Sequence, residues 1–213
     1  MKALVKVLSV RLLGLKIRQI NMEKIILAST SIYRKQQLER LNISFSTAAP
    51  NIDEEAFKAK GLDHIQLSKE LSLLKARNIS NFYDDAIVLG GDQVASFNQT
   101  ILSKPKTKER AFEQLKSMAG KEHELITSLA IITNGQEYIH TSIANMKMRQ
   151  LTDTQISRYI DIDNPFHSCG SYRLEALGIG LFESINCEDY TSIIGIPLMW
   201  TARKLSELGV SVP

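Results

Sequence analysis

The chain has little of what stabilises small secreted proteins or forms metal-binding modules. Its 213 residues include only two cysteines, Cys169 and Cys187, which offer neither a disulfide framework nor the spacing of a zinc site. The four histidines are scattered along the chain in no pattern typical of a catalytic triad or a zinc centre. This cysteine usage suits a reducing compartment, so we expect a cytoplasmic protein.

Long apolar runs, internal repeats, linkers and low-complexity segments are also missing. No run approaches the roughly 20 apolar residues that a membrane-spanning helix needs, so we expect no membrane partner. Hydrophobic residues make up 44% of the chain and charged residues 23%, which is ordinary for a globular protein. A chain of this length can bury a core as one domain.

Acidic residues are absent from residues 1–21, which carry five basic ones, and this segment accounts for the formal net charge of +3. The remainder is slightly acidic, so we expect no nucleic-acid partner. Residues 1–21 could form an amphipathic helix, a targeting peptide or sequence upstream of the natural start. Met22 resembles a natural first residue. We therefore interpret residues 1–21 as an extension without function and residues 22–213 as a single domain.

The stretch Ala86-Ile-Val-Leu-Gly-Gly-Asp92-Gln93-Val94 is the most informative one. Its short apolar run predicts a buried strand, and the two glycines are typical of a strand end or a close approach of other groups. An acid is then placed where we expect the strand to end. A carboxylate at such a position holds a metal, activates a water molecule or is an ordinary loop residue.

The first predicted strand, at residues 25–27, leads into Ala28-Ser-Thr-Ser31 and a helix expected over residues 33–41. Ser and Thr typically cap a helix, and the exposed N–H groups of a helix start also bind phosphate. Arg34 and Lys35 in the first turn oppose the helix dipole. An anion shared by both cations explains them better than two solvated side chains do.

Two further segments carry charged residues whose role the sequence pattern alone does not decide. The acidic turn at residues 50–55 is a solvated loop or supplies an oxygen ligand to a divalent cation such as Mg²⁺. Lys75 lies near the end of a helix predicted over residues 64–79, where a lysine is ordinary dipole chemistry. The remaining pattern predicts a helix capped by Thr107 that runs to residue 118, and a hairpin around Asn134-Gly135. It also predicts a helix over residues 152–162 that opens with a capping box of Thr152 and Gln155, and a final helix with Pro197 at its start.

These pieces, taken together, resemble the Maf nucleotide pyrophosphatases, also called septum formation inhibitors. The resemblance covers the chain from Met22 to the last helix and rests on an ordered set of short motifs. They are Leu27-Ala-Ser-Thr-Ser-Ile-Tyr-Arg34, Asp53-Glu54, Lys75-Ala76, Gly91-Asp92-Gln93, Lys104-Pro105, Gly120-Lys121, Gly170-Ser171 and Gly195-Ile196-Pro197. Gln93, where a Thr is common, and the segment ending in Glu175 resemble the branch of the family that hydrolyses 7-methyl-GTP.

The resemblance implies an α/β, elongated, two-lobed Maf/ITPase-like fold with a mixed twisted sheet and a central cleft. It implies hydrolysis of a nucleoside triphosphate between the α and β phosphates with a divalent metal, Mg²⁺ or Mn²⁺, giving a monophosphate and pyrophosphate. The residues it assigns fall into four groups. They are Asp92, Lys75 and Lys104 as catalytic residues, Ser29, Arg34 and Lys35 for substrate binding, Tyr33, Gln93 and Glu175 for base specificity, and Glu54 and Asp92 for the metal.

The chemistry of these residue types agrees with that reaction. Cleavage at phosphorus builds negative charge, which positioned cations stabilise. Asp92 could deprotonate water or bind the metal, and the sequence does not separate the two roles. Glu175 can accept hydrogen bonds from guanine, and the face of Tyr33 can stack on the cationic ring of 7-methylguanine.

Lys35 stands where the family commonly has a second Arg. A lysine keeps the positive charge but does not bind phosphate through two N–H groups as an arginine does. Two alternatives to 7-methyl-GTP hydrolysis stay open: a pyrophosphatase for dTTP, UTP or CTP, disfavoured by Gln93 and Glu175, and a non-catalytic nucleotide-binding regulator of cell division. The retained acids and lysines argue against the regulator. The oligomeric state, monomer or homodimer, is also open.

Overall fold

In the computed structural model of the chain, residues 24–58 and 60–212 are described, and the extension interpreted above lies outside them. Within these ranges, seven strands form one sheet: β1 Lys24–Ala28, β2 Phe45–Ala48, β3 Ala86–Phe97, β4 Thr100–Leu102, β5 Glu122–Thr133, β6 Gln136–Met148 and β7 Phe182–Asn186. The α-helices are α1 Ile32–Glu39, α2 Glu54–Lys58, α3 His64–Ser80, α4 Lys108–Met118, α5 Asp153–Asp163 and α6 Leu198–Glu207. Three short 3₁₀ helices complete the elements of the described part of the chain: η1 Cys169–Ser171, η2 Leu177–Leu181 and η3 Tyr190–Ile194.

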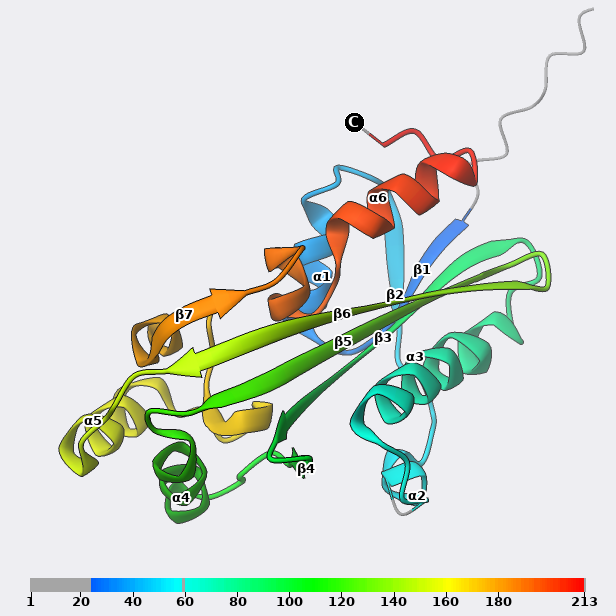
Figure 1. The fold of residues 1–213 in the computed structure, drawn as a ribbon. Helices are drawn as coiled ribbons and strands as arrows, with labels where there is room; N and C mark the ends of the chain where they lie inside the picture. Colours follow the sequence, from blue (N-terminus) through cyan, green and yellow to red (C-terminus); the bar gives the residue numbers. More distant parts are fainter. Residues whose placement is uncertain (1–23, 59, 213) are drawn as a thin grey trace, which may run out of the picture.

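The sheet is mixed and has the strand order β2-β1-β3-β5-β6-β7, with β4 added to β3. β1 runs parallel to β2 and β3, whereas β3, β5, β6 and β7 are antiparallel neighbours. The long strands β3, β5 and β6 run through the length of the molecule (Figure 1). The α/β class and the mixed sheet expected from the sequence are confirmed.

Two groups of elements lie at opposite ends of these long strands (Figure 1). We call β1, β2, α1, α2, α3, α6 and η3 the first lobe, and β4, α4, α5, η1, η2 and β7 the second lobe. Each lobe has a buried core of its own. Within the described residues, no helix combines the length and the apolar character needed to cross a bilayer.

The core of the first lobe is divided between the two faces of the sheet, because successive strand residues point to opposite sides. Ile25 and Leu27 of β1 pack with residues of α1 and α6, whereas Ile26 and Ala28 pack with residues of α3. The second lobe has a single cluster in which α4 and α5 cover the far ends of β5 and β6. Its members include Leu115, Met118, Ile156, Ile160, Leu125 and Met146.

Local sequence signals explain several element boundaries. Thr152 and Gln155 form the predicted capping box of α5, each side chain bonding the backbone N–H of the other. Asn134 and Gly135 both have positive φ and close a two-residue hairpin turn between β5 and β6. These boundary predictions are therefore confirmed.

One expectation about the central stretch is wrong. β3 does not end at Gly90 and Gly91 but continues through Asp92 to Phe97, paired with β5 along the way. The glycines are needed for close packing on the two faces of the strand. A Cβ at Gly90 would lie 2.4 Å from the carbonyl oxygen of Ser72 in α3, and one at Gly91 would lie 3.2 Å from Arg34 Nε.

Candidate active site

The candidate site lies beside a gap in the pairing of β3. β1 pairs with β3 only as far as Leu89, and β4 begins to pair with it at Ala95. Between them, residues 90–94 are paired with β5 alone, and Asp92 is the middle residue of this gap. The acid thus follows the end of the neighbouring parallel strand, where α/β proteins commonly bind ligands, although its own strand continues.

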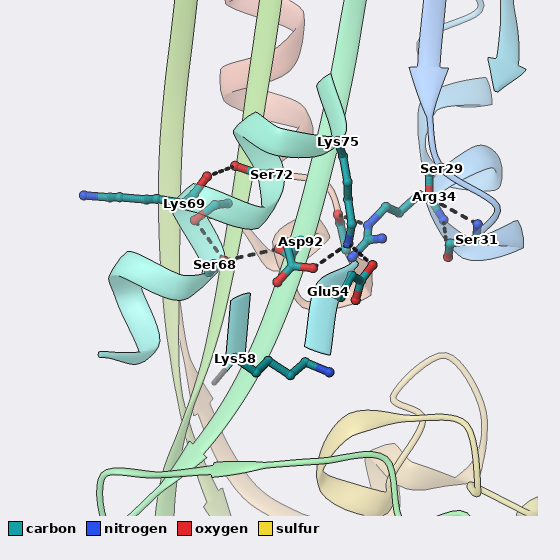
Figure 2. A network of polar contacts seen from close by, with 12 residues as sticks. Ser29, Ser31, Arg34, Glu54, Lys58, Ser68, Lys69, Ser72, Lys75 and Asp92 are labelled. Atoms are coloured by element: carbon teal, nitrogen blue, oxygen red, sulfur yellow. Dashed lines mark hydrogen bonds and ion pairs between the residues drawn. The ribbon is translucent and has the colours of Figure 1, made fainter. Parts of the chain in front are cut away.

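Asp92 forms a buried ion pair with Lys75 of α3 (Figure 2). Lys75 Nζ lies 2.6 Å from Asp92 Oδ1 and 2.9 Å from Oε1 of Glu54, the first residue of α2. The side chains of Lys75 and Asp92 are almost completely buried, and that of Glu54 is partly exposed. One lysine therefore brings together two carboxylates that lie 38 residues apart in the sequence.

The two carboxyl groups have pKa shifts in opposite directions. Burial raises the pKa of Asp92, and the charges of Lys75 and Arg34 only partly oppose this effect. Burial also acts to raise the pKa of Glu54, but the ion pair with Lys75 outweighs it and lowers that pKa. Asp92 is thus the more basic of the two carboxylates that share Lys75.

Arg34 approaches Asp92 from the first turn of α1 (Figure 2). Ser31 caps α1 by accepting a hydrogen bond from the backbone N–H of Arg34, and the buried Ser29 hydroxyl accepts one from the N–H of Ser31. Arg34 Nε donates to the carbonyl oxygen of Gly195 at 3.2 Å. The guanidinium is therefore anchored through Nε, which leaves its two terminal nitrogens available for a phosphate.

The second lobe borders the same site. Burial raises the pKa of the Cys169 thiol in η1, and the charges of Lys104, Asp92 and Lys58 also act on it. Lys104, which is exposed in the segment between β4 and α4, likewise acts on the pKa of Glu54. Charged groups of both lobes thus lie near enough to influence one another's pKa.

The structure does not bring every residue of the expected set together. Lys35 is exposed on α1 and pairs with Glu39, 3.7 Å away, one turn along the helix. Glu175 is also exposed. Gln93 Nε2 donates to Thr127 Oγ1 at 2.9 Å and to the carbonyl oxygens of two residues of η3, which ties β3 to that turn.

Two residues near the site were not singled out from the sequence. Lys58 lies one turn after Glu54 on α2, pairs with Glu55 at 2.7 Å and helps to lower the pKa of Glu54. Its spacing of four residues from Glu54 was a signal that it shares a helix face with that acid. Arg173 donates to the hydroxyl of Tyr33, a contact between residues 140 positions apart that no local pattern indicates.

The donor set at this site is compatible with Mg²⁺ or Mn²⁺. Among residues 24–58 and 60–212, no three His, Cys, Asp or Glu side chains gather as a metal-binding group. Glu54 and Asp92 supply two carboxylates, and Mg²⁺ is commonly held by one or two carboxylates together with water and substrate phosphates. The residues present therefore fit a metal that is completed by a phosphorylated ligand.

The fold and the site define a mixed α/β protein with a buried acid and converging cations, a combination suited to phosphate chemistry. The profile of the Maf-like protein family matches residues 24–208. This chain belongs to that family.

Relatives of the chain include three proteins named 7-methyl-GTP pyrophosphatase. That of Bdellovibrio bacteriovorus is 44% identical over 83% of this chain and 93% of its own length. That of Pseudoalteromonas translucida is 40% identical over 88% of this chain and 93% of its own length, and that of Pseudomonas aeruginosa is 37% identical over 90% and 100%. Among solved structures, the Staphylococcus aureus Ham1 protein aligns with a TM-score of 0.42 and 10% identity, covering 60% of this chain and 73% of that one.

Proposed function

We propose that this protein is a hydrolase that cleaves 7-methyl-GTP to 7-methyl-GMP and pyrophosphate with the help of a divalent metal. The observation that carries the proposal is the buried Asp92, which shares Lys75 with Glu54 beside Arg34. The names of the three relatives support both the reaction and the nucleotide.

In the proposed reaction, a water molecule adds to the α phosphorus and the bond from that phosphorus to the bridging oxygen breaks. Asp92 takes the proton of the attacking water, and the raised pKa of its carboxyl group makes it a better acceptor at neutral pH. The electron pair of the broken bond leaves with pyrophosphate. The hydrogen bonds between described residues reach only one carboxylate oxygen of Asp92, Oδ1, so the other can accept this proton.

Cations of both lobes would stabilise the charge that develops on the phosphates. Arg34 clamps phosphate oxygens through its terminal nitrogens, while Lys75 and Lys104 act as point charges. Glu54 would hold the metal, with Asp92 as its second ligand in the alternative in which the metal, rather than Asp92, activates the water. The bound metal would neutralise phosphate charge. Ser29 and Lys35 remain proposed phosphate-binding residues.

We assign base selection to Tyr33, Gln93 and Glu175. The hydrogen bonds of the Gln93 amide nitrogen leave its carbonyl oxygen as the group that can read a donor edge of the base. We also propose a cytoplasmic location, consistent with the two free cysteines, and no nucleic-acid or membrane partner.

The test is pyrophosphate release from 7-methyl-GTP, GTP, dTTP, UTP and CTP, each measured with Mg²⁺, with Mn²⁺ and with a chelator. We expect a clear preference for 7-methyl-GTP that the chelator abolishes. Preference for a pyrimidine nucleotide would keep the reaction and overturn the proposed base selection. No turnover of any of them would favour a nucleotide-binding regulator.

A further inference from the structure

Arg173, in the loop between η1 and η2, is held by a buried acid of the second lobe. Its Nε lies 3.1 Å from Asp163 Oδ2, and its Nη2 lies 2.8 Å from Asp163 Oδ1 and 2.6 Å from the Asp163 carbonyl oxygen. Tyr159 completes this arrangement, because its hydroxyl donates to Asp163 Oδ2 at 2.7 Å and accepts from the Arg173 backbone N–H at 3.1 Å. The guanidinium is thus fixed in position and orientation by α5.

One nitrogen of this fixed guanidinium points to the first lobe. Arg173 Nη1 lies 3.4 Å from the hydroxyl of Tyr33, which is half-buried on α1. Tyr33 directly precedes Arg34, the residue proposed to clamp phosphate. Because one nucleotide carries its base and its phosphates a ribose apart, neighbouring residues in one helical turn can contact both parts.

We infer that Arg173 is a positioning residue: held by Asp163 and Tyr159 on the second lobe, it fixes the Tyr33 hydroxyl and thereby the orientation of the aromatic ring that stacks on the base. This inference rests on the proposed function, to which it adds a residue outside the phosphate machinery. Its consequence is that base binding depends on a contact between the lobes, whereas the groups around Asp92 do not involve Arg173.

The inference can be tested with a double-mutant cycle of Tyr33→Phe and Arg173→Lys. Tyr33→Phe removes the hydroxyl but keeps the ring, and Arg173→Lys keeps a charge for Asp163 but loses the nitrogen that reaches Tyr33. We expect each single variant to raise KM for 7-methyl-GTP about fivefold, the value of one ordinary hydrogen bond. The kcat should stay within about twofold of the original protein, because only binding of the base is affected.

The double variant should be no worse than either single one, because both remove the same contact. If the increases in KM of the two single variants instead multiply in the double variant, the inference is overturned. A loss of kcat with KM unchanged would overturn it as well. Arg149→Lys is the matched control, because Arg149 is an exposed arginine of the same half of the molecule that donates to the Gly180 carbonyl oxygen. It should leave both constants unchanged.

Two further measurements keep the outcome clear. If Arg173→Lys melts well below the original protein, Tyr33→Phe still decides, since it leaves the Arg173–Asp163 pair in place. Inorganic tripolyphosphate, which lacks a base, should inhibit Tyr33→Phe and the original protein with inhibition constants within about twofold. A larger change would place Tyr33 among the phosphate contacts and overturn the inference.

Failure of the proposed function would give a different result. If another nucleotide is the better substrate, 7-methyl-GTP is wrong, and the same cycle is measured with that nucleotide. If none is hydrolysed, the cycle is measured as the Kd for 7-methyl-GTP by calorimetry. In each case, coupling between the two substitutions supports the positioning role of Arg173 and additive effects contradict it.

Discussion

Two buried aspartates, one beside the gap in β3 and one at the end of α5, differ in how many of their carboxylate oxygens accept hydrogen bonds. Asp92 and Asp163 are 6% and 4% exposed. Asp163 accepts hydrogen bonds at both carboxylate oxygens, from Arg173 and Tyr159. Asp92 receives its side-chain hydrogen bond from Lys75, at Oδ1.

The pKa values of the two groups follow this difference. Burial acts to raise the pKa of Asp163, but the hydrogen bonds from Arg173 and Tyr159 outweigh it and lower that pKa. At Asp92, burial is the larger effect and the pKa is raised. A carboxylate that accepts hydrogen bonds at both oxygens is held in its charged form and stabilises the fold, whereas one that accepts at a single oxygen is more readily protonated.

The largest expected effect is on catalysis at Asp92. Asp92→Asn removes the proposed proton acceptor but keeps the shape of the side chain, so we expect kcat to fall by about a thousandfold. The midpoint of thermal unfolding should change little, because Lys75 keeps its ion pair with Glu54. Steady-state pyrophosphate release and a melting curve check both parts, and a variant with more than a tenth of the original kcat would contradict the assignment.

His123 sharpens the comparison because it is a buried ionisable group without a countercharge. Burial lowers its pKa to about 4 in the folded protein, and its Nδ1 has no hydrogen-bond partner among the described residues. In the unfolded chain the pKa is about 6.5, so between these values the unfolded state binds a proton that the folded state does not. The free energy of unfolding should therefore fall by up to about 3 kcal/mol as the pH drops from 6.5 to 4.

Urea unfolding at a series of pH values measures this loss. The slope between pH 6.5 and 4 should become shallower in His123→Gln and stay unchanged in His167→Gln, since His167 is exposed. Asp163 does not explain a loss in this range, because its lowered pKa places its contribution at more acidic pH. An equal slope in the original protein and His123→Gln would show that another group is responsible.

A smaller effect is expected at Asp163, this time on stability. Asp163→Asn leaves the partly exposed Arg173 without its countercharge, so we expect the free energy of unfolding to fall by about 2 kcal/mol at neutral pH. The kcat of the folded variant should stay close to that of the original protein. If Asp163→Asn remains folded and loses kcat as severely as Asp92→Asn, the distinction between a reactive and a structural aspartate is wrong.

Local signals in the sequence were sufficient to predict many of the helix starts and turns of the fold. The caps at Thr107 and Thr152 and the turn at Asn134-Gly135 depend on a few neighbouring residues, and the structure has them where they were predicted. The family was also identified correctly, because its short motifs keep their order along the chain.

Long-range contacts account for what the sequence did not reveal. Glycines were interpreted as the end of β3, but Gly90 accommodates a helix that packs against the strand. The contact of Tyr33 with Arg173 depends on how the two lobes meet, which no window of neighbouring residues encodes. Asp92 could be selected as the central acid, yet the burial that makes it basic follows from packing of α3 on the sheet.

The gap in the pairing of β3 also has a mechanical consequence. β3 is paired with β1 before the gap and with β4 after it, and between these points β5 is its one strand neighbour among the described residues. In the five residues centred on Asp92, β3 therefore has strand pairing on one edge alone, and the other edge is left to side chains and ligands. The segment that carries the acid thus keeps the mechanical support of β5 on one edge while the backbone N–H and C=O groups of its other edge have no strand partner in the described part of the chain.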